Sequence, residues 1–184
     1  MKRLTMRSTK WVAMVTLLLL IVATGCSGNR SRDVKDGVKR SLEQAGFNDV
    51  KVDQDRDTGV VTLSGQVTSD DEKARAETAA KAAAGDQVVA NQIAVRPPGF
   101  ESESKEIASD LDTGIEKNFH AALISHRLDK GVKYQAKNGV LTLEGEVNSQ
   151  AKRDRLEQLA TSIPNVKQVV NEIQVKDQKA TTTQ

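Results

Sequence analysis

The sequence predicts an α+β fold made of two tandem αββαβ domains, each a small three-stranded mixed sheet with two helices on one face. The main observation is an internal repeat: residues 59–95 return without a gap at 139–175, 80 positions later. Within each copy, apolar residues recur every fourth position where a helix is expected, and alternate with polar residues where a strand is expected. One folding unit is therefore used twice.

Each unit is predicted to begin with a helix whose buried side carries an apolar residue every fourth position. Asp33 and Asp110 precede the two stripes as N-caps, and Gly46 is placed to end the first helix. The stripes are 77 positions apart instead of 80, which predicts a three-residue insertion within 121–129. The stripe residues are Val34, Val38 and Leu42, then Leu111, Ile115 and Phe119.

Two strands joined by a tight turn are predicted next: 50–54 and 60–67 in the first repeat, 132–136 and 140–147 in the second. Gly59 and Gly139 stand at the turns, where a hairpin requires positive φ. Gly65 and Gly145 lie within the second strands and are expected at bulges. None of these glycines precedes the Lys-Ser/Thr pair of a phosphate-binding loop, so we interpret all four as structural.

A second helix and a returning strand complete each unit. Ser69 and Glu72 form a capping box, and the crossover makes the last strand parallel to the strand before the helix. Asn91 and Asn171 share the inward parity of the last strands, so we interpret them as structural pins that hydrogen-bond a neighbouring loop, with a ligand role as the alternative. The predicted buried sides are Ala76, Ala79, Ala80 and Ala83, against Leu156, Leu159, Ala160 and Ile163. The alanine-rich first domain should be the less stable one.

The chain begins with a predicted signal peptide, residues 1–25. A basic stretch precedes an apolar run of 13 residues, which is shorter than the roughly 20 needed to span a bilayer. The run ends at Cys26, the single cysteine of the chain, in a sequence that resembles a bacterial lipobox. We expect lipidation of Cys26, the alternative being an ordinary cleavage site. The remaining divisions are a tether at 26–32, domains at 33–95 and 109–176 joined by a linker at 96–108, and a disordered tail at 177–184.

Charge argues against a nucleic-acid partner. The whole chain is +2, but the signal peptide holds four of the 27 basic residues and no acid, so the remainder is −2. Four aromatic residues after the signal peptide are too few for base stacking. The first domain carries a net charge of −4 and residues 104–176 carry +1, so the second domain is the better candidate for an anionic surface.

The matching strand sequences Gly-Val-Val-Thr-Leu-Ser-Gly-Gln-Val and Gly-Val-Leu-Thr-Leu-Glu-Gly-Glu-Val, with the Val-x-Asn-x-Ile-x-Val strands, resemble the BON domain. The resemblance covers 33–175. Two such domains behind a lipobox are similar to the dual-BON envelope proteins of the DolP and OsmY types. The resemblance implies a role in envelope integrity, binding of anionic phospholipid through the first helix of the second domain, and no chemistry. Ser27 after the cysteine resembles an outer-membrane sorting signal.

The densest basic stretch lies at the end of that helix, between 117 and 133, where Asp129 is the single acid. Basic residues beside apolar ones suit an anionic lipid interface. The alternative is a solvated face whose apolar residues belong to the interdomain core. The candidate lipid-binding residues are Lys117, Phe119, His120, Arg127, Lys130 and Lys133.

No catalytic or metal site is predicted. His120 and His126 are the only histidines, and neither belongs to a set with metal-ligand spacing or beside an evident nucleophile. We therefore expect neither a cofactor nor enzymatic activity. A competing interpretation is a periplasmic protein-interaction adaptor or chaperone-like factor, which would bind envelope proteins through open sheet edges or a helix face.

Overall fold

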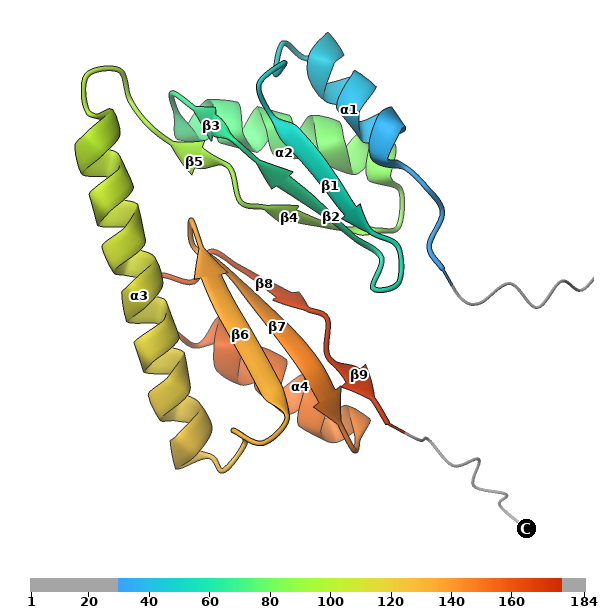
Figure 1. Cartoon of the computed structure of the whole chain (residues 1–184), viewed down its shortest axis with the longest axis vertical. Helices are drawn as coiled ribbons and strands as arrows, with labels where there is room; N and C mark the ends of the chain where they lie inside the picture. The colour runs from blue at the N-terminus through green and yellow to red at the C-terminus, as the bar shows by residue number, and fades with distance from the viewer. Residues whose placement is uncertain (1–29, 177–184) are drawn as a thin grey trace, which may run out of the picture.

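The computed structural model describes residues 30–176 and shows the αββαβ order twice (Figure 1). The signal peptide, Cys26 and the predicted tail lie outside the described residues. The first domain comprises α1 (Lys35–Gln44), β1 (Lys51–Asp55), β2 (Val60–Ser64), β3 (Gln66–Val67), α2 (Asp70–Ala84), β4 (Val88–Asn91) and β5 (Ala94–Val95). The second comprises α3 (Glu101–Ser125), β6 (Val132–Lys137), β7 (Val140–Val147), α4 (Gln150–Thr161), β8 (Gln168–Asn171) and β9 (Gln174–Val175).

Both sheets have the predicted mixed topology. In the first, β2 lies between antiparallel β1 and parallel β4, and the short β3 and β5 extend the parallel pair. In the second, β7 lies between antiparallel β6 and parallel β8 and also pairs with β9. The helices of each domain cover one face of its sheet, which confirms the predicted fold class.

Each domain has its own apolar core beneath its two helices. The second helix contributes Ala76, Ala80 and Ala84 to the first core, and Leu156, Ala160 and Ile163 to the second. Ala79, Ala83 and Leu159 were predicted to be buried, but they are half-buried at the edges of these cores. The side chains that α4 contributes are larger and bury more apolar area than the alanines of α2. We therefore still predict that the first domain is the less stable one.

The start of α1 is capped differently from the prediction. Asp33 accepts one bond, from the Lys35 N–H at 3.3 Å. The Gln54 side chain, from β1, accepts from both the Val34 N–H at 3.1 Å and the Lys35 N–H at 3.2 Å. The first orphan donors of the helix are therefore satisfied mainly by a residue distant in sequence. At the other end, Gly46 (φ 88°) stops the helix as predicted.

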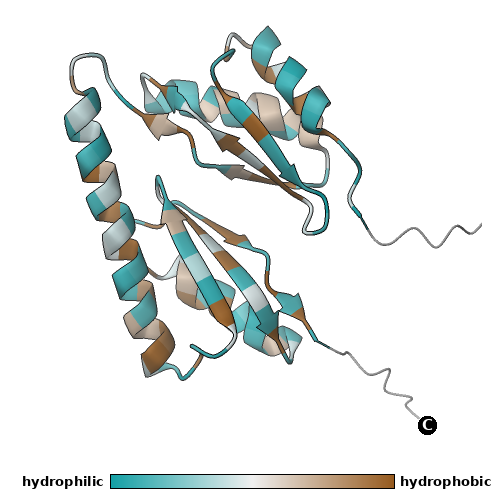
Figure 2. Cartoon of the chain, in the orientation of Figure 1, coloured by the Kyte–Doolittle hydropathy of each residue, from teal (hydrophilic) through white to brown (hydrophobic). Residues whose placement is uncertain are grey.

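The predicted linker is largely helical, because α3 begins at Glu101 instead of after Asp110. Pro97 and Pro98 cannot continue a helix, whereas 101–108 contains good helix formers and no proline. Apolar positions recur along the length of α3 and gather in its last turns (Figure 2). Its buried residues are Ile115, Phe119 and Leu123; Leu111, predicted to be buried, is 45% exposed.

The alignment of α1 with α3, the first helix of each domain, also differs from the prediction. The Leu128 N–H donates to the Leu123 carbonyl at 2.9 Å, as the Phe47 N–H donates to Leu42. Leu123 therefore occupies the place of Leu42, 81 positions earlier, and the predicted offset of 77 with a three-residue insertion is wrong. The error arose from matching Leu111 to Val34. The hairpin loops differ instead: 56–59 in the first domain is longer than 138–139 in the second.

The two sheets face each other with their helix-free sides, and the helices lie outside (Figure 1). Four apolar side chains form a small core between the sheets: Val60, Ala90, Val140 and Val170. Val60 and Val140 are equivalent in the two repeats, and so are Ala90 and Val170. The docked faces are thus nearly the same surface used twice.

Gln168 links the two sheets at their edges. Its Nε2 donates to the Val89 carbonyl at 2.7 Å, and its Oε1 accepts from the Asn91 N–H at 3.0 Å. One side-chain amide therefore takes the place of a neighbouring strand along β4, whose outer N–H and C=O groups would otherwise be unpaired. The equivalent residue of the first repeat is Val88, which is apolar and 47% exposed. Val88 has no side-chain polar group, so it cannot bond the edge of β8 as Gln168 bonds the edge of β4.

Candidate functional site

The end of α3 presents a cationic surface with one large apolar side chain. Lys117, His120 and Ile124 follow an i, i+3, i+7 spacing and so share one face of the helix, opposite its buried side. Arg127 and Lys130 follow in the loop to β6, and both are exposed. We call these five residues the basic end. Ile124 is 55% exposed and was not among the predicted lipid-binding residues.

Phe119 does not belong to this surface. It is 0% exposed and meets the Tyr134 ring edge-to-face, with the centroids 5.1 Å apart. The Tyr134 hydroxyl lies 2.8 Å from Nδ1 of His120, which connects β6 to the exposed face of the helix. Phe119 was predicted both as a member of the buried stripe and as a lipid contact. The first prediction is confirmed and the second is wrong, because Phe119 lies between Ile115 and Leu123 on the buried side of α3.

Lys133 is exposed but lies apart from the basic end. Adjacent strand residues point to opposite faces of a sheet. Tyr134 faces α3, so Lys133 points to the other side, where Glu144 stands opposite it in the register. Lys152 instead lies beside the basic end, because its Nζ donates to the Lys130 carbonyl at 2.9 Å from the first turn of α4. No sequence pattern links residues 22 positions apart on different elements.

Arg127 has a strained backbone. Its φ of 56° is in the left-handed region, where it ends α3 as Gly46 ends α1. The other non-glycine residues with positive φ in the described chain are both asparagines, Asn138 and Asn165, which tolerate this conformation. An arginine there forfeits stability that a glycine would retain.

Asn91 and Asn171 attach the last strand of each domain to its second helix. Asn91 is 2% exposed, and its Nδ2 donates to Oε2 of Glu77 at 2.9 Å and to the Lys73 carbonyl at 3.3 Å. Asn171 repeats the bond with Glu157 at 2.9 Å. The partner in both domains is a helix, whereas a loop was predicted. Gly59, Gly139, Gly65 and Gly145 all have positive φ: the first two stand at hairpin turns, Gly65 lies between β2 and β3, and Gly145 lies inside β7.

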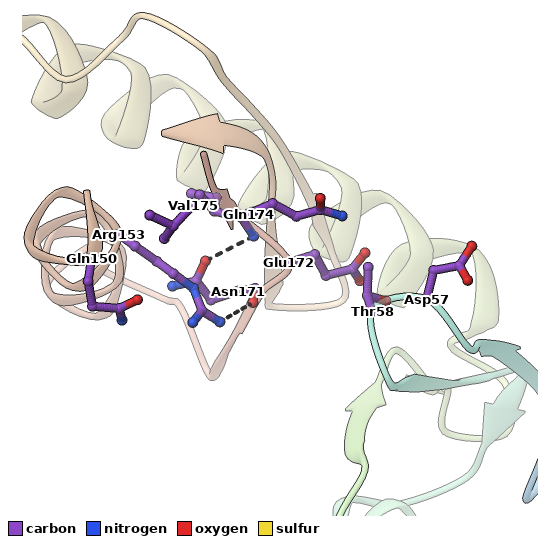
Figure 3. A pocket seen from close by; sticks show the side chains of 9 residues that line it. Asp57, Thr58, Gln150, Arg153, Asn171, Glu172, Gln174 and Val175 are labelled. Carbon is purple, nitrogen blue, oxygen red and sulfur yellow. Dashed lines mark hydrogen bonds between the residues drawn. The ribbon is translucent and has the colours of Figure 1, made fainter. Parts of the chain in front are cut away.

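A pocket of about 580 Å³ opens between the domains, where the β1–β2 hairpin tip approaches the end of β8 (Figure 3). Arg153 enters it from α4 and donates from Nη2 to the Asn171 carbonyl at 3.2 Å. Glu172 lies on the opposite wall beside Thr58. Burial raises the pKa of the Glu172 carboxyl, and the nearby charges of Glu144 and Asp55 raise it further.

Glu172→Gln is expected to stabilise the protein at pH 7. Because the folded state holds the Glu172 pKa above its ordinary 4.5, ionisation opposes folding. The contribution of the protonated carboxyl is complete below the unfolded pKa and is lost as the pH rises through the folded pKa. Urea unfolding should therefore show a more stable variant at pH 7 and no difference near pH 3. Equal stability at both pH values would contradict this account.

The BON domain profile matches two stretches, residues 30–97 and 111–177. The chain belongs to the BON family. This BON protein is 36% identical over 129 residues to osmotically-inducible protein Y of Escherichia coli (strain K12), a match that spans 69% of this chain and 61% of that protein. The chain thus spans less than two thirds of that relative. It is also 31% identical over 123 residues to an uncharacterized protein in the gshII 5′ region of Anaplasma centrale, spanning 66% and 79% of the two chains.

Among solved structures, the C-terminal domain of CdsD, a structural protein of the type III secretion system of Chlamydia trachomatis, aligns with 79% of this BON protein and 98% of its own length, at 14% identity and a TM-score of 0.34. Within residues 30–176, no helix has both the length and the apolar composition to cross a bilayer. No three His, Cys, Asp or Glu side chains in those residues gather as metal ligands would.

Proposed function

We propose that this BON protein is a non-enzymatic lipoprotein of the cell envelope, held through lipidated Cys26 on the periplasmic face of the outer membrane. Its second domain binds anionic phospholipid through the basic end, and the binding supports envelope integrity. From Cys26 to Asp33 the tether reaches at most about 25 Å, which keeps the first domain close to the membrane. Anchoring raises the local concentration of lipid, so weak contact at the basic end is sufficient.

The observation that carries the proposal is the backbone of Arg127. A cation is kept in a left-handed conformation at the exposed tip of α3, where the first repeat has glycine. Strain of this kind persists where a side chain serves a function. Lys130 and Lys152 add charge beside it, and Ile124 supplies an apolar group that can enter the interface. Each basic side chain near an anionic surface contributes about 1 kcal/mol.

The test uses the chain from Ser27 onward, without the acyl anchor, and vesicles with or without phosphatidylglycerol. Both domains are kept, because the second domain alone would expose Val140 and Val170. We expect flotation with the anionic vesicles, none with neutral phosphatidylcholine, and a decrease as salt is added. Arg127→Gly combined with Lys130→Gln should abolish flotation while the protein stays folded, since glycine suits the left-handed position.

Lys133→Gln is the matched control, because it removes one positive charge from the opposite face of the sheet. It should leave flotation unchanged. Salt-independent binding, binding to neutral vesicles, or equal loss in the control would each exclude the basic end as a lipid site.

The adaptor interpretation allows binding through a sheet edge or through a helix face, and the sheet-edge mode has less support at β4 and β6, two of the four outer strands. Gln168 occupies the edge of β4, and Glu116 accepts from the Ala136 N–H at 2.9 Å on the edge of β6. Two backbone groups of β4 and one of β6 are therefore already paired, which leaves fewer groups for strand addition at these two edges. A helix-face contact keeps support from two exposed apolar residues, Phe100 at the N-cap of α3 and Ile107 in its first half. Crosslinking in the envelope separates the two functions: one dominant protein partner, retained after Arg127 and Lys130 are neutralised, favours the adaptor.

A further inference from the structure

A second interdomain cleft lies on the other side of the docked sheets, away from the pocket of Figure 3 and from the basic end. It has two lobes that share Lys73, Asn138 and Lys167. The larger lobe, about 420 Å³, is polar. The smaller lobe, about 170 Å³, is lined on its apolar side by Ile93, Val95, Ala108 and Leu111, which come from the first domain and from α3.

The two lysines come from different domains and converge at the junction of the lobes. Neither Lys73 nor Lys167 forms an ion pair within residues 30–176. Burial lowers the pKa of Lys73 most, and the positive charge of Lys167 lowers it further, while the charges of Asp70, Glu77 and Asp112 act in the opposite direction without reversing the shift. A half-buried ammonium beside a like charge is costly unless an anion compensates it.

The nearby carboxylates are mostly engaged elsewhere. Glu77 binds Lys81 and Asn91. Asp112 accepts from the Asn138 N–H at 2.7 Å and from the Gly139 N–H at 2.9 Å. Asp70, in the first turn of α2, is the remaining acid of the cleft. The ammonium groups of Lys73 and Lys167 are thus able to form ion pairs with an anionic ligand.

The lysine of the second domain is held in place by the hairpin. The aliphatic part of the Lys167 side chain packs against Gly139. A Cβ atom added at Gly139 would lie 3.1 Å from the Lys167 Cγ. The Lys167 N–H also donates to the Gly139 carbonyl at 2.8 Å. Gly139 therefore serves both the turn and the close approach of the Lys167 side chain, which lines both lobes.

The apolar lobe sets the size of the ligand. A cavity of roughly 150 Å³ lined by aliphatic side chains holds a molecule of the size of benzene. The lobe of about 170 Å³ is similar, and it adjoins the two ammonium groups. An anion without an apolar group would leave this lobe unfilled, and a neutral apolar molecule would leave both lysines without an ion pair.

We propose that this cleft binds a small free carboxylic acid, with its carboxylate between Lys73 and Lys167 and an apolar chain of about six carbons in the lobe beside Ala108 and Leu111. The site requires both docked domains, because each contributes one cation. It is independent of the basic end, so either proposal can fail alone.

The experiment follows amide NMR shifts and titration heats of the chain from Ser27 with hexanoate, acetate and 1-hexanol. Hexanoate should bind saturably and shift the Asn138 and Gly139 amides. Acetate loses the burial of four CH2 groups, and 1-hexanol loses a hydrogen bond to a charged group, so each should bind more than about tenfold more weakly.

Two variants test the two halves of the site. Lys73→Gln with Lys167→Gln should weaken hexanoate binding by more than about tenfold. Ala108→Trp fills the lobe from the lightly covered half of α3 and should abolish binding while both lysines remain. Lys51→Gln, an exposed lysine on β1, is the control and should bind as the parent does. The proposal is overturned by a lack of saturable hexanoate binding, by hexanol binding equally well, or by unchanged binding in the filled variant.

Discussion

Phe119→Ala is expected to lower the free energy of unfolding by about 3–5 kcal/mol, the range for removing a fully buried phenylalanine. The side chain is completely inaccessible and contacts Tyr134 edge-to-face, so the variant loses buried area, leaves a cavity and loses an aromatic pair. Chemical denaturation followed by circular dichroism measures the change. Unfolding of the second domain should respond first.

Ile124→Ala is the matched comparison, five positions along the same helix. It is more than half exposed, so its effect on stability should stay within about 0.5 kcal/mol. Its effect should appear in flotation with anionic vesicles instead. A stable Phe119→Ala variant with reduced lipid binding would reverse the assignment of Phe119 to the core.

Gly145→Ala is expected to produce the other large loss of stability. Gly145 has φ 122° within β7, and a Cβ would collide with the Gly131 carbonyl oxygen, which belongs to the backbone and cannot move aside. Backbone strain alone costs about 1–3 kcal/mol, and the collision adds to it. The same urea titration measures this change, and the Gly131–Gly145 contact should be the first part of the sheet to exchange its amide protons.

Gly114→Ala is the control for this substitution. Gly114 lies inside α3 with nothing within 4 Å of the added methyl, and its φ is that of the helix. Alanine should stabilise the protein there by about 0.5–1 kcal/mol. The free energy of unfolding should therefore fall for Gly145→Ala and rise for Gly114→Ala. Equal effects of the two substitutions would show that the close approach at Gly145 does not constrain the sheet.

The hairpins and the crossovers were predictable because their signals are local. The Asn138-Gly139 turn and the Ser69 cap each depend on residues a few positions apart. The cap of α1 was not predictable, because Gln54 is some twenty residues from the N–H groups that it accepts from. The early start of α3 was missed for another reason: 101–108 has helix propensity but no apolar stripe to reveal it.

The candidate site was predicted less well than the fold. The basic stretch was visible in the sequence, but its division between two faces depends on the register of β6, which places Lys133 away from α3. Phe119 was listed as a lipid contact because it lies within the basic stretch, although its place in the apolar stripe already predicted that it is buried. Lys152 and the cleft around Lys73 and Lys167 arise from contacts between separate elements and separate domains. Such contacts carry no pattern in a single sequence.

The amide of Gln168 also bears on how the protein behaves at high density. Anchored as proposed, copies of the protein would share a plane and meet far more often than they do in solution, and bare strand edges are templates for fibre growth. Gln168 pairs with two outward backbone groups of β4, and Glu116 accepts from one outward N–H of β6. Two of the four outer strands thus offer fewer free groups to the edge of a neighbouring copy.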